Sequence, residues 1–165
     1  MMVTLTGFMG SGKTTVGKVL ADFLGCPFMD LDDLIVKKAG KSIPDIFAQD
    51  GEPAFRELEA QVLRKTVEKY AESTAVLALG GGAVLAPASA ALLHEKTVCI
   101  YLRATLDTLL ARLAGETAGR PLADDALASR LASREPIYEE TAHVIIDTDG
   151  LSPDEVADEI IISAL

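Results

Sequence analysis

Near its N-terminus the chain reads Gly7-Phe8-Met9-Gly10-Ser11-Gly12-Lys13-Thr14. A glycine, four free positions and then Gly-Lys-Thr are typical of a loop that holds nucleotide phosphates. Glycines let the backbone approach an anion closely, and the helix that we expect to begin near Lys13 adds the partial positive charge of its N-terminus. We expect the Lys13 ammonium to reach the β and γ phosphates, and the Thr14 hydroxyl to ligate Mg²⁺.

The residues around this loop predict a strand before it and a helix after it. Val3-Thr4-Leu5-Thr6 is typical of a buried strand, and apolar residues at helical spacing follow, including Val16, Leu20 and Phe23. Further short apolar strands are expected near residues 27–30, 75–79, 98–102 and 144–147, alternating with helical segments. This alternation predicts an α/β fold of three layers, in which helices flank a five-stranded parallel sheet. With 165 residues, we expect a single domain over residues 1–165.

The composition limits the possible partners. A formal net charge of −10 argues against nucleic acid and anionic membranes as partners, and any site for small anions must concentrate arginine and lysine locally. Residues 75–93 carry no charge, but Gly80 to Gly82 and Pro87 interrupt them, so we expect no membrane span. Neither histidine has the spacing of a metal ligand. Without a basic leader or a leftover apolar stripe, we expect a cytoplasmic monomer.

The residues that directly follow three predicted strands carry the chemistry. Ligands of parallel α/β sheets bind at the carboxyl ends of the strands, so the phosphate loop, Asp30 to Asp33 and Gly80 to Gly82 should lie along one edge. Asp30 ends a strand, where its oxygens can hold Mg²⁺ directly or through water. Asp32 is placed to accept the proton of an attacking hydroxyl. The alternative is that these acids only favour the N-terminus of the next helix.

Three arginines are candidates for binding anions. Arg56 lies beside the apolar stripe of a predicted helix with Glu59 one turn later, so it is either an exposed ion pair or an arginine held to grip a carboxylate. Arg120 falls in a segment, about residues 114–125, that is rich in glycine, proline and charge, and that we expect to form a short lid. Arg134 lies in the following helix. Taken singly, each arginine is as consistent with solvated surface as with a site.

Together these motifs resemble those of the shikimate kinases. The matching pieces are G-F-M-G-S-G-K-T-T-x-G-K from Gly7, D-x-D at Asp30, D-I-F at Asp45, F-R-x-x-E at Phe55, G-G-G at Gly80, R-P-L at Arg120 and R-x-P-x-Y at Arg134. The resemblance runs from the first predicted strand to the last helix. It implies a three-layer P-loop kinase fold and an enzyme that transfers the γ-phosphoryl group of MgATP to the 3-hydroxyl of shikimate. The products would be shikimate 3-phosphate and ADP, in the biosynthesis of aromatic amino acids.

The resemblance also implies roles for individual residues. The catalytic residues would be Asp32, which holds and activates the hydroxyl, Lys13, and Arg120 in the lid. Shikimate would contact Asp32, Phe47, Phe55, Arg56, Gly80, Gly81, Gly82 and Arg134, of which the first four come from substrate-binding helices within about residues 31–70. ATP would contact Gly10, Ser11, Gly12, Lys13, Thr14, Thr15, Arg112 and Arg120. Thr14 and Asp30 would serve Mg²⁺.

Three other functions share parts of this pattern. A kinase for gluconate or a nucleoside monophosphate would use the same phosphate loop, but has no need for Phe55-Arg56 together with the triple glycine. A GTPase usually recognises guanine through N-K-x-D, and this chain contains no asparagine. A nucleotide-binding protein without activity would be expected to have lost Lys13, Asp32 or Arg120, and all three are present.

Overall fold

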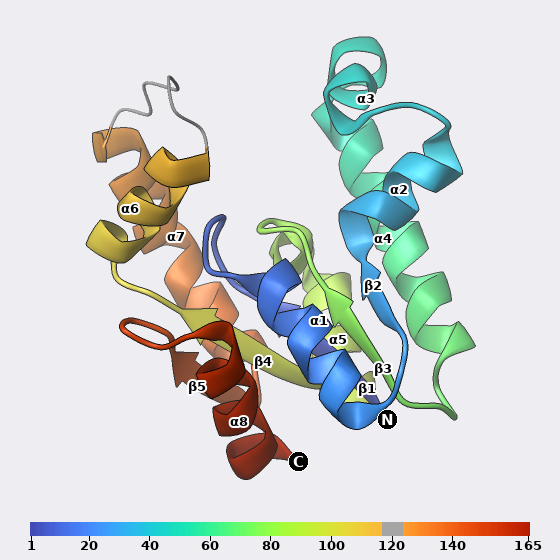
Figure 1. Cartoon of the computed structure of the whole chain (residues 1–165). Coiled ribbons are helices and arrows are strands. Elements are labelled where there is room, and N and C mark those ends of the chain that lie inside the picture. The colour runs from blue at the N-terminus through green and yellow to red at the C-terminus, as the bar shows by residue number, and fades with distance from the viewer. Residues whose placement is uncertain (117–123) are drawn as a thin grey trace.

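The computed structural model describes residues 1–116 and 124–165. Its centre is a parallel five-stranded sheet in the order β2-β3-β1-β4-β5 (Figure 1). The strands are β1 (Met2–Thr6), β2 (Phe28–Asp30), β3 (Ala75–Ala78), β4 (Val98–Arg103) and β5 (Val144–Asp147). β1 lies in the middle, with Val3 in register with Val76 of β3 and with Val98 of β4. The predicted α/β fold with a parallel five-stranded sheet is confirmed.

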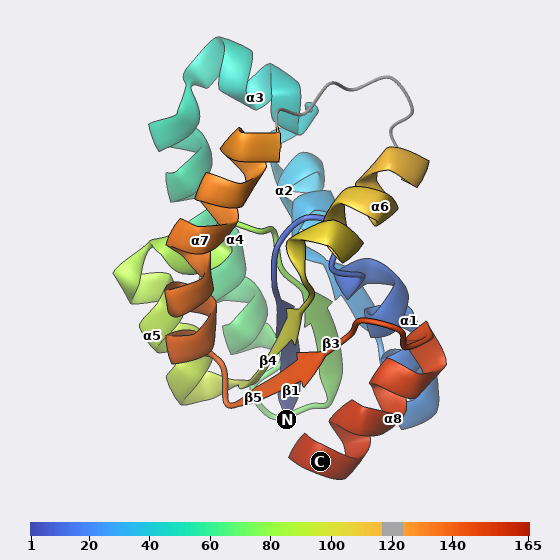
Figure 2. The ribbon, with the colours of Figure 1, turned by 90° about the vertical axis from the view of Figure 1, so that its left-hand side faces the viewer.

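Helices cover both faces of the sheet. They are α1 (Lys13–Leu24), α2 (Leu31–Ala39), α3 (Ile43–Asp50), α4 (Glu52–Lys69), α5 (Pro87–Lys96), α6 (Leu106–Glu116), α7 (Asp124–Thr141) and α8 (Pro153–Ala164), with a short 3₁₀ turn η1 (Ala83–Leu85). α1 and α8 lie on one side of the sheet, and α4, α5 and α7 on the other (Figure 2). None of the helices in the described ranges is both long and apolar enough to cross a membrane.

The strands are buried on both faces because alternate side chains enter two separate apolar clusters. Val76 and Ile100 pack with residues of α1 and α8, whereas their neighbours Leu77 and Tyr101 pack with residues of α4, α5 and α7. This two-sided burial explains why the strands are runs of apolar residues rather than alternating polar and apolar ones. Because β2, β3 and β1 are parallel neighbours in the sheet, their carboxyl ends lie side by side at one edge.

The structure differs from the predicted elements at three points. The sequence predicts no helix over α5, because Pro87 looks like a break in it. In the structure Pro87 stands at the first helical position, where a missing N–H costs nothing. Before the fifth strand the sequence predicts only a short helix, through about residues 130–135. α7 is much longer, and Pro136 lies inside it without ending it. Phe23, predicted to lie in the buried stripe of α1, is 64% exposed.

Candidate active site

The phosphate loop joins β1 to α1 at the carboxyl edge of the sheet. Gly10 and Gly12 have φ values of 80° and 93°, a left-handed conformation that glycine adopts without strain. The Lys13 ammonium lies across the loop and donates hydrogen bonds to the carbonyl oxygens of Gly7 and Phe8 at 2.7 and 3.0 Å. With the N-terminus of α1 beginning at Lys13, the loop forms a concave site suited to an anion.

Asp30 connects the phosphate loop to the first turn of α2. The Thr14 hydroxyl donates to Asp30 Oδ2 at 2.9 Å, and the backbone N–H of Asp32 donates to Asp30 Oδ1 at 2.9 Å. The second bond caps the N-terminus of α2 and orients the turn that carries Asp32. Thr14 and Asp30 thus present hard oxygen atoms next to the loop, which is the ligand type that Mg²⁺ takes.

A cavity of about 230 Å³, here called the acceptor cavity, opens beside the phosphate loop. It brings together all the residues predicted to bind shikimate, namely Asp32, Phe47, Phe55, Arg56, Gly80, Gly81, Gly82 and Arg134. They come from α2, α3, α4, the loop after β3, and α7. The rings of Phe47 and Phe55, with centroids 4.7 Å apart, form an apolar wall.

Arg56 is held on two sides. Its Nη1 donates to Glu59 Oε1 at 2.8 Å, and Glu59 is only 4% exposed. On another side the backbone at Gly82 comes so close that a Cβ there would lie 2.5 Å from Arg56 Nη1. The sequence left open whether Arg56 forms an exposed ion pair or is held in place. The buried partner and the close glycine make it a held guanidinium facing the acceptor cavity.

Tyr138 links α7 to the triple-glycine loop. Its hydroxyl donates to the carbonyl oxygen of Gly81 at 2.5 Å, and its ring is fully buried against Tyr101, with centroids 5.0 Å apart. One turn earlier in α7, the guanidinium of Arg134 lies 5.8 Å from the centre of the Phe8 ring, at the start of the phosphate loop. α7 is thereby attached to both loops that line the acceptor cavity.

Burial and neighbouring charges shift three pKa values here. Desolvation, with the nearby Asp30 carboxylate, raises the pKa of Asp32 although Lys13 opposes the shift. Desolvation lowers the pKa of Lys13 to about 8, with Asp32 and Asp30 opposing. Desolvation also raises the pKa of Glu59, against its hydrogen bond with Arg56. A carboxylate of raised pKa beside an ammonium of lowered pKa is typical of a site that moves protons.

A second cavity, of about 200 Å³, opens at the phosphate loop next to α1 and α8. The predicted ATP-binding residues Gly10, Ser11, Gly12, Thr15 and Arg112 all line it. Arg112 spans the cavity wall, because its Nη1 donates to the Gly10 carbonyl at 3.2 Å and its Nη2 to the Thr148 carbonyl at 3.3 Å. Thr148 also lines this cavity, and no sequence motif singled it out.

Some predicted features are not placed, and some residues of the site were not predicted. Arg120 and residues 117–123 of the predicted lid lie outside the described residues. The acceptor cavity is also lined by Met9, Ile43 and Arg130. Arg130 lies one helical turn before Arg134, and that spacing is the signal that would have found it. Met9 belongs to the phosphate loop itself, whereas Ile43 is an ordinary apolar residue in the sequence, so only the fold could show its place.

Comparison with known proteins identifies the family. The family model for shikimate kinase matches residues 9–164. The chain belongs to the shikimate kinase family. A shikimate kinase from Geobacter sulfurreducens is 47% identical over 163 residues, which cover 96% of this chain and 87% of that protein. A shikimate kinase from Enterococcus faecalis is 43% identical over 164 residues, covering 96% and 95%.

A solved structure of the same family shows the same fold. The shikimate kinase from Acinetobacter baumannii in complex with shikimate has a TM-score of 0.87 and 35% identity to this chain, covering 97% of it and 90% of that chain. The resemblance to shikimate kinases predicted from the motifs is therefore confirmed. Membership of the shikimate kinase family makes the chain an ATP-dependent kinase with shikimate as its phosphoryl acceptor.

Proposed function

We propose that the acceptor cavity binds shikimate and presents its 3-hydroxyl to the γ-phosphate of ATP, giving shikimate 3-phosphate and ADP in aromatic amino-acid biosynthesis. One observation carries this proposal. The cavity beside the phosphate loop combines arginines, among them Arg56 and Arg134, with the carboxylate of Asp32. An acceptor that fits has a carboxylate for the arginines and a hydroxyl for the acid.

The walls of the cavity suit a ring that carries hydroxyl groups. Phe47 and Phe55 offer an apolar surface to one face of such a ring. Gly80 to Gly82 offer backbone groups without side chains in the way, so the loop can approach ring hydroxyls closely. The Arg56 guanidinium, already oriented by Glu59, can grip the carboxylate with two parallel hydrogen bonds.

Phosphoryl transfer then depends mainly on positioning and charge. Asp32 would accept a hydrogen bond from the 3-hydroxyl and take its proton as the bond to phosphorus forms. Lys13 would move from its loop carbonyls to the β and γ phosphates and stabilise the charge that develops there. Arg120, from the proposed lid near residues 114–125, would bridge shikimate and the γ-phosphate and stabilise the same charge.

The residues present fit Mg²⁺. Thr14 and Asp30 supply hard oxygens within hydrogen-bond distance of each other. Within residues 1–116 and 124–165, no group of three or more His, Cys, Asp or Glu side chains could hold a metal ion. Mg²⁺ keeps several waters and takes phosphate oxygens of the nucleotide, so it needs only one or two oxygens from the protein. When bound, Mg²⁺ would neutralise charge on the transferring phosphate.

The rest of the nucleotide would occupy the cavity next to α1 and α8. The backbone of Gly10, Ser11 and Gly12 would hold the α and β phosphates, with Thr15 beside them. Arg112 and Thr148 also line this cavity, and the base would lie beside them. We further propose that residues 1–165 form one domain and that the protein acts as a monomer in the cytoplasm.

The proposed function is tested by measuring ADP release from MgATP with and without shikimate. Gluconate and nucleoside monophosphates serve as control acceptors. Release that depends on shikimate alone is the expected result. Release with gluconate instead would show a kinase with another acceptor, and Arg56 and Arg134 would no longer be assigned to shikimate. No release with any acceptor would contradict the proposal.

A further inference from the structure

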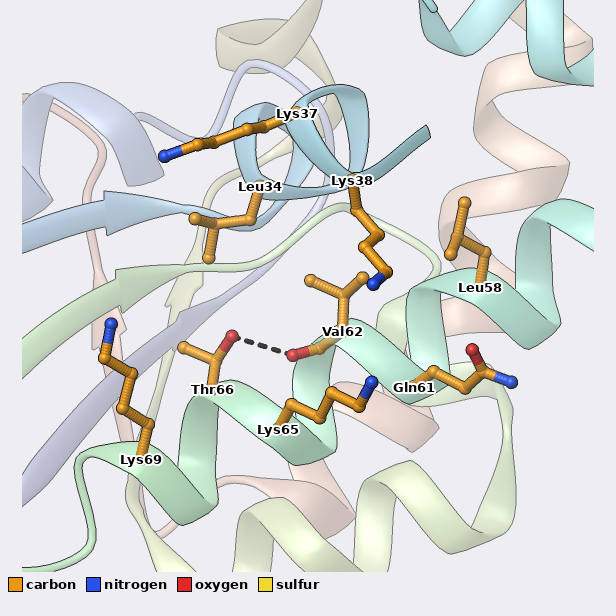
Figure 3. A pocket seen from close by; sticks show the side chains of 9 residues that line it. All are labelled: Leu34, Lys37, Lys38, Leu58, Gln61, Val62, Lys65, Thr66 and Lys69. Carbon is orange, nitrogen blue, oxygen red and sulfur yellow. Dashed lines mark hydrogen bonds between the residues drawn. The ribbon is translucent and has the colours of Figure 1, made fainter. Parts of the chain in front are cut away.

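A cavity of about 370 Å³ lies between α2 and α4 (Figure 3). It is separate from the acceptor cavity and from the cavity next to α1 and α8, here called the nucleotide cavity. We call the cavity between α2 and α4 the lysine groove. It is lined by Leu34, Lys37 and Lys38 from α2 and by Leu58, Gln61, Val62, Lys65, Thr66 and Lys69 from α4. It shares no lining residue with the other two cavities. Neither the sequence motifs nor the proposed function uses any of these residues.

The groove concentrates positive charge in an acidic protein. Four of the eight lysines of the chain line it, although the formal net charge is −10. None of its nine lining residues is acidic. Within the described part of the chain, none of these four lysines forms an ion pair, and the Lys69 ammonium lies 5.5 Å from the centre of the Tyr70 ring. Their ammonium groups are therefore available to an anion.

The floor of the groove is apolar. Leu34 and Leu58 are partly buried, and Val62 is 8% exposed. The Thr66 hydroxyl, the polar group on the floor, donates to the Val62 carbonyl at 2.7 Å within α4, as Figure 3 shows. Because that donor is already satisfied, the floor offers a ligand mainly hydrocarbon surface, while the rim offers ammonium groups.

The lysines stand at two ends of this floor. Figure 3 shows Lys38 from α2 and Lys65 from α4 extending toward the space in front of Val62, whereas Lys37 and Lys69 point toward the left of the view. Lys38 and Lys65 thus face one position above the floor from two different helices. Lys37 and Lys69 add positive charge at the other end of the groove, on the far side of Leu34.

We propose that the lysine groove binds a small organic dianion, a molecule with an apolar body and an acidic group at each end. An inorganic polyanion would satisfy the lysines but leave the apolar floor in water, and a neutral apolar molecule would do the reverse. The volume lies within the range of sites for small molecules. Because α2 carries Asp32 and α4 carries Arg56, such a ligand would bridge the two helices that support the acceptor cavity.

The test is calorimetric titration of the whole protein with a naphthalene disulfonate, which has two acidic groups on an apolar body. Saturating ADP and shikimate occupy the other two cavities during the titration. The K38Q/K65Q variant removes one ammonium from each helix. The R64Q/K96Q variant removes the same charge from exposed positions outside the groove, one of them on α4. All four substitutions are at exposed residues, so folding should be retained.

We expect one disulfonate to bind per chain in the unchanged protein and in R64Q/K96Q, and to bind at least about tenfold more weakly in K38Q/K65Q, since each lost ammonium removes a charged contact. Pyrophosphate and naphthalenemethanol should each bind at least about tenfold more weakly than the disulfonate. Equal affinity in both double variants, equal affinity for pyrophosphate, or no saturable binding would overturn the proposal. Failure of shikimate to bind would count against the proposed function alone, because ADP and the disulfonate would still report on their own sites.

Discussion

Gly82 is the position where one added methyl group tests the acceptor cavity most directly. Its φ of −106° and ψ of 4° are open to alanine, so the substitution Gly82→Ala should not strain the backbone. The new Cβ would lie 2.5, 2.6 and 2.8 Å from Nη1, Nη2 and Cζ of Arg56. Because non-bonded heavy atoms prefer separations of about 3.5 Å, the guanidinium must move by roughly 1 Å.

The cost follows from what Arg56 binds. A hydrogen bond to a charged group contributes about 1.5–3 kcal/mol, and a guanidinium displaced by this amount should lose at least one such bond to the carboxylate of shikimate. We expect a loss of about 2–3 kcal/mol, which corresponds to roughly a 30- to 150-fold higher KM for shikimate. The KM for ATP should stay unchanged, because the three atoms nearest to the new methyl group all belong to Arg56.

Steady-state kinetics of a double-mutant cycle give the measurement. The cycle compares the unchanged protein with Gly82→Ala, Arg56→Ala and both together. Without the Arg56 guanidinium there is nothing for the methyl group to displace, so adding Gly82→Ala to Arg56→Ala should raise the KM less than about threefold. A normal KM in Gly82→Ala, or the same loss with and without Arg56, would refute the reasoning.

Three further predictions concern the reaction and its supports. Asp32→Asn should lower kcat by about 10²–10⁴-fold, the usual contribution of a general base, with little change in ATP affinity; near-normal turnover would remove Asp32 from the mechanism. Tyr138→Phe leaves the Gly81 carbonyl without its partner, so urea denaturation should show a free energy of unfolding lower by about 1–2 kcal/mol, and the KM for shikimate should rise while ATP affinity does not. An unchanged KM would show that Tyr138 only stabilises the fold. Because the pKa of Lys13 is lowered to about 8, the free protein loses this ammonium as the pH rises through that value, so ATP affinity should be full below it. Affinity measured at about pH 9 should be up to about tenfold weaker than at about pH 7, whereas Lys13→Arg, which stays charged, should lose this dependence; a pH-independent affinity in the unchanged protein would contradict the shift.

The local parts of the fold could be predicted because their causes are local. The strand before the phosphate loop and the helix after it follow from apolar spacing and from the glycines between them. The start of α8 follows from the capping box of Ser152 and Glu155, which the structure contains. α5 was missed for an equally local reason, since a proline at the first helical position and a proline that breaks a helix look alike within a short stretch. Pro136 shows the converse, because packing of α7 against the sheet retains a helix that a local rule would end.

The sequence alone determined which groups are available for chemistry: the phosphate loop, Asp30 and Asp32, the triple glycine, and arginines in an acidic chain. It could not determine which of these groups touch. The hold of Gly82 on Arg56 and the bond from Tyr138 to Gly81 join residues 26 and 57 positions apart, and the lysine groove exists only because α2 packs on α4. Such distances depend on the order of strands in the sheet and on which helix faces pack together. The strand order and the packing of the helix faces are set by the burial of the whole core. A single stretch of sequence supplies only one of the surfaces that pack together there, so it cannot determine the contact.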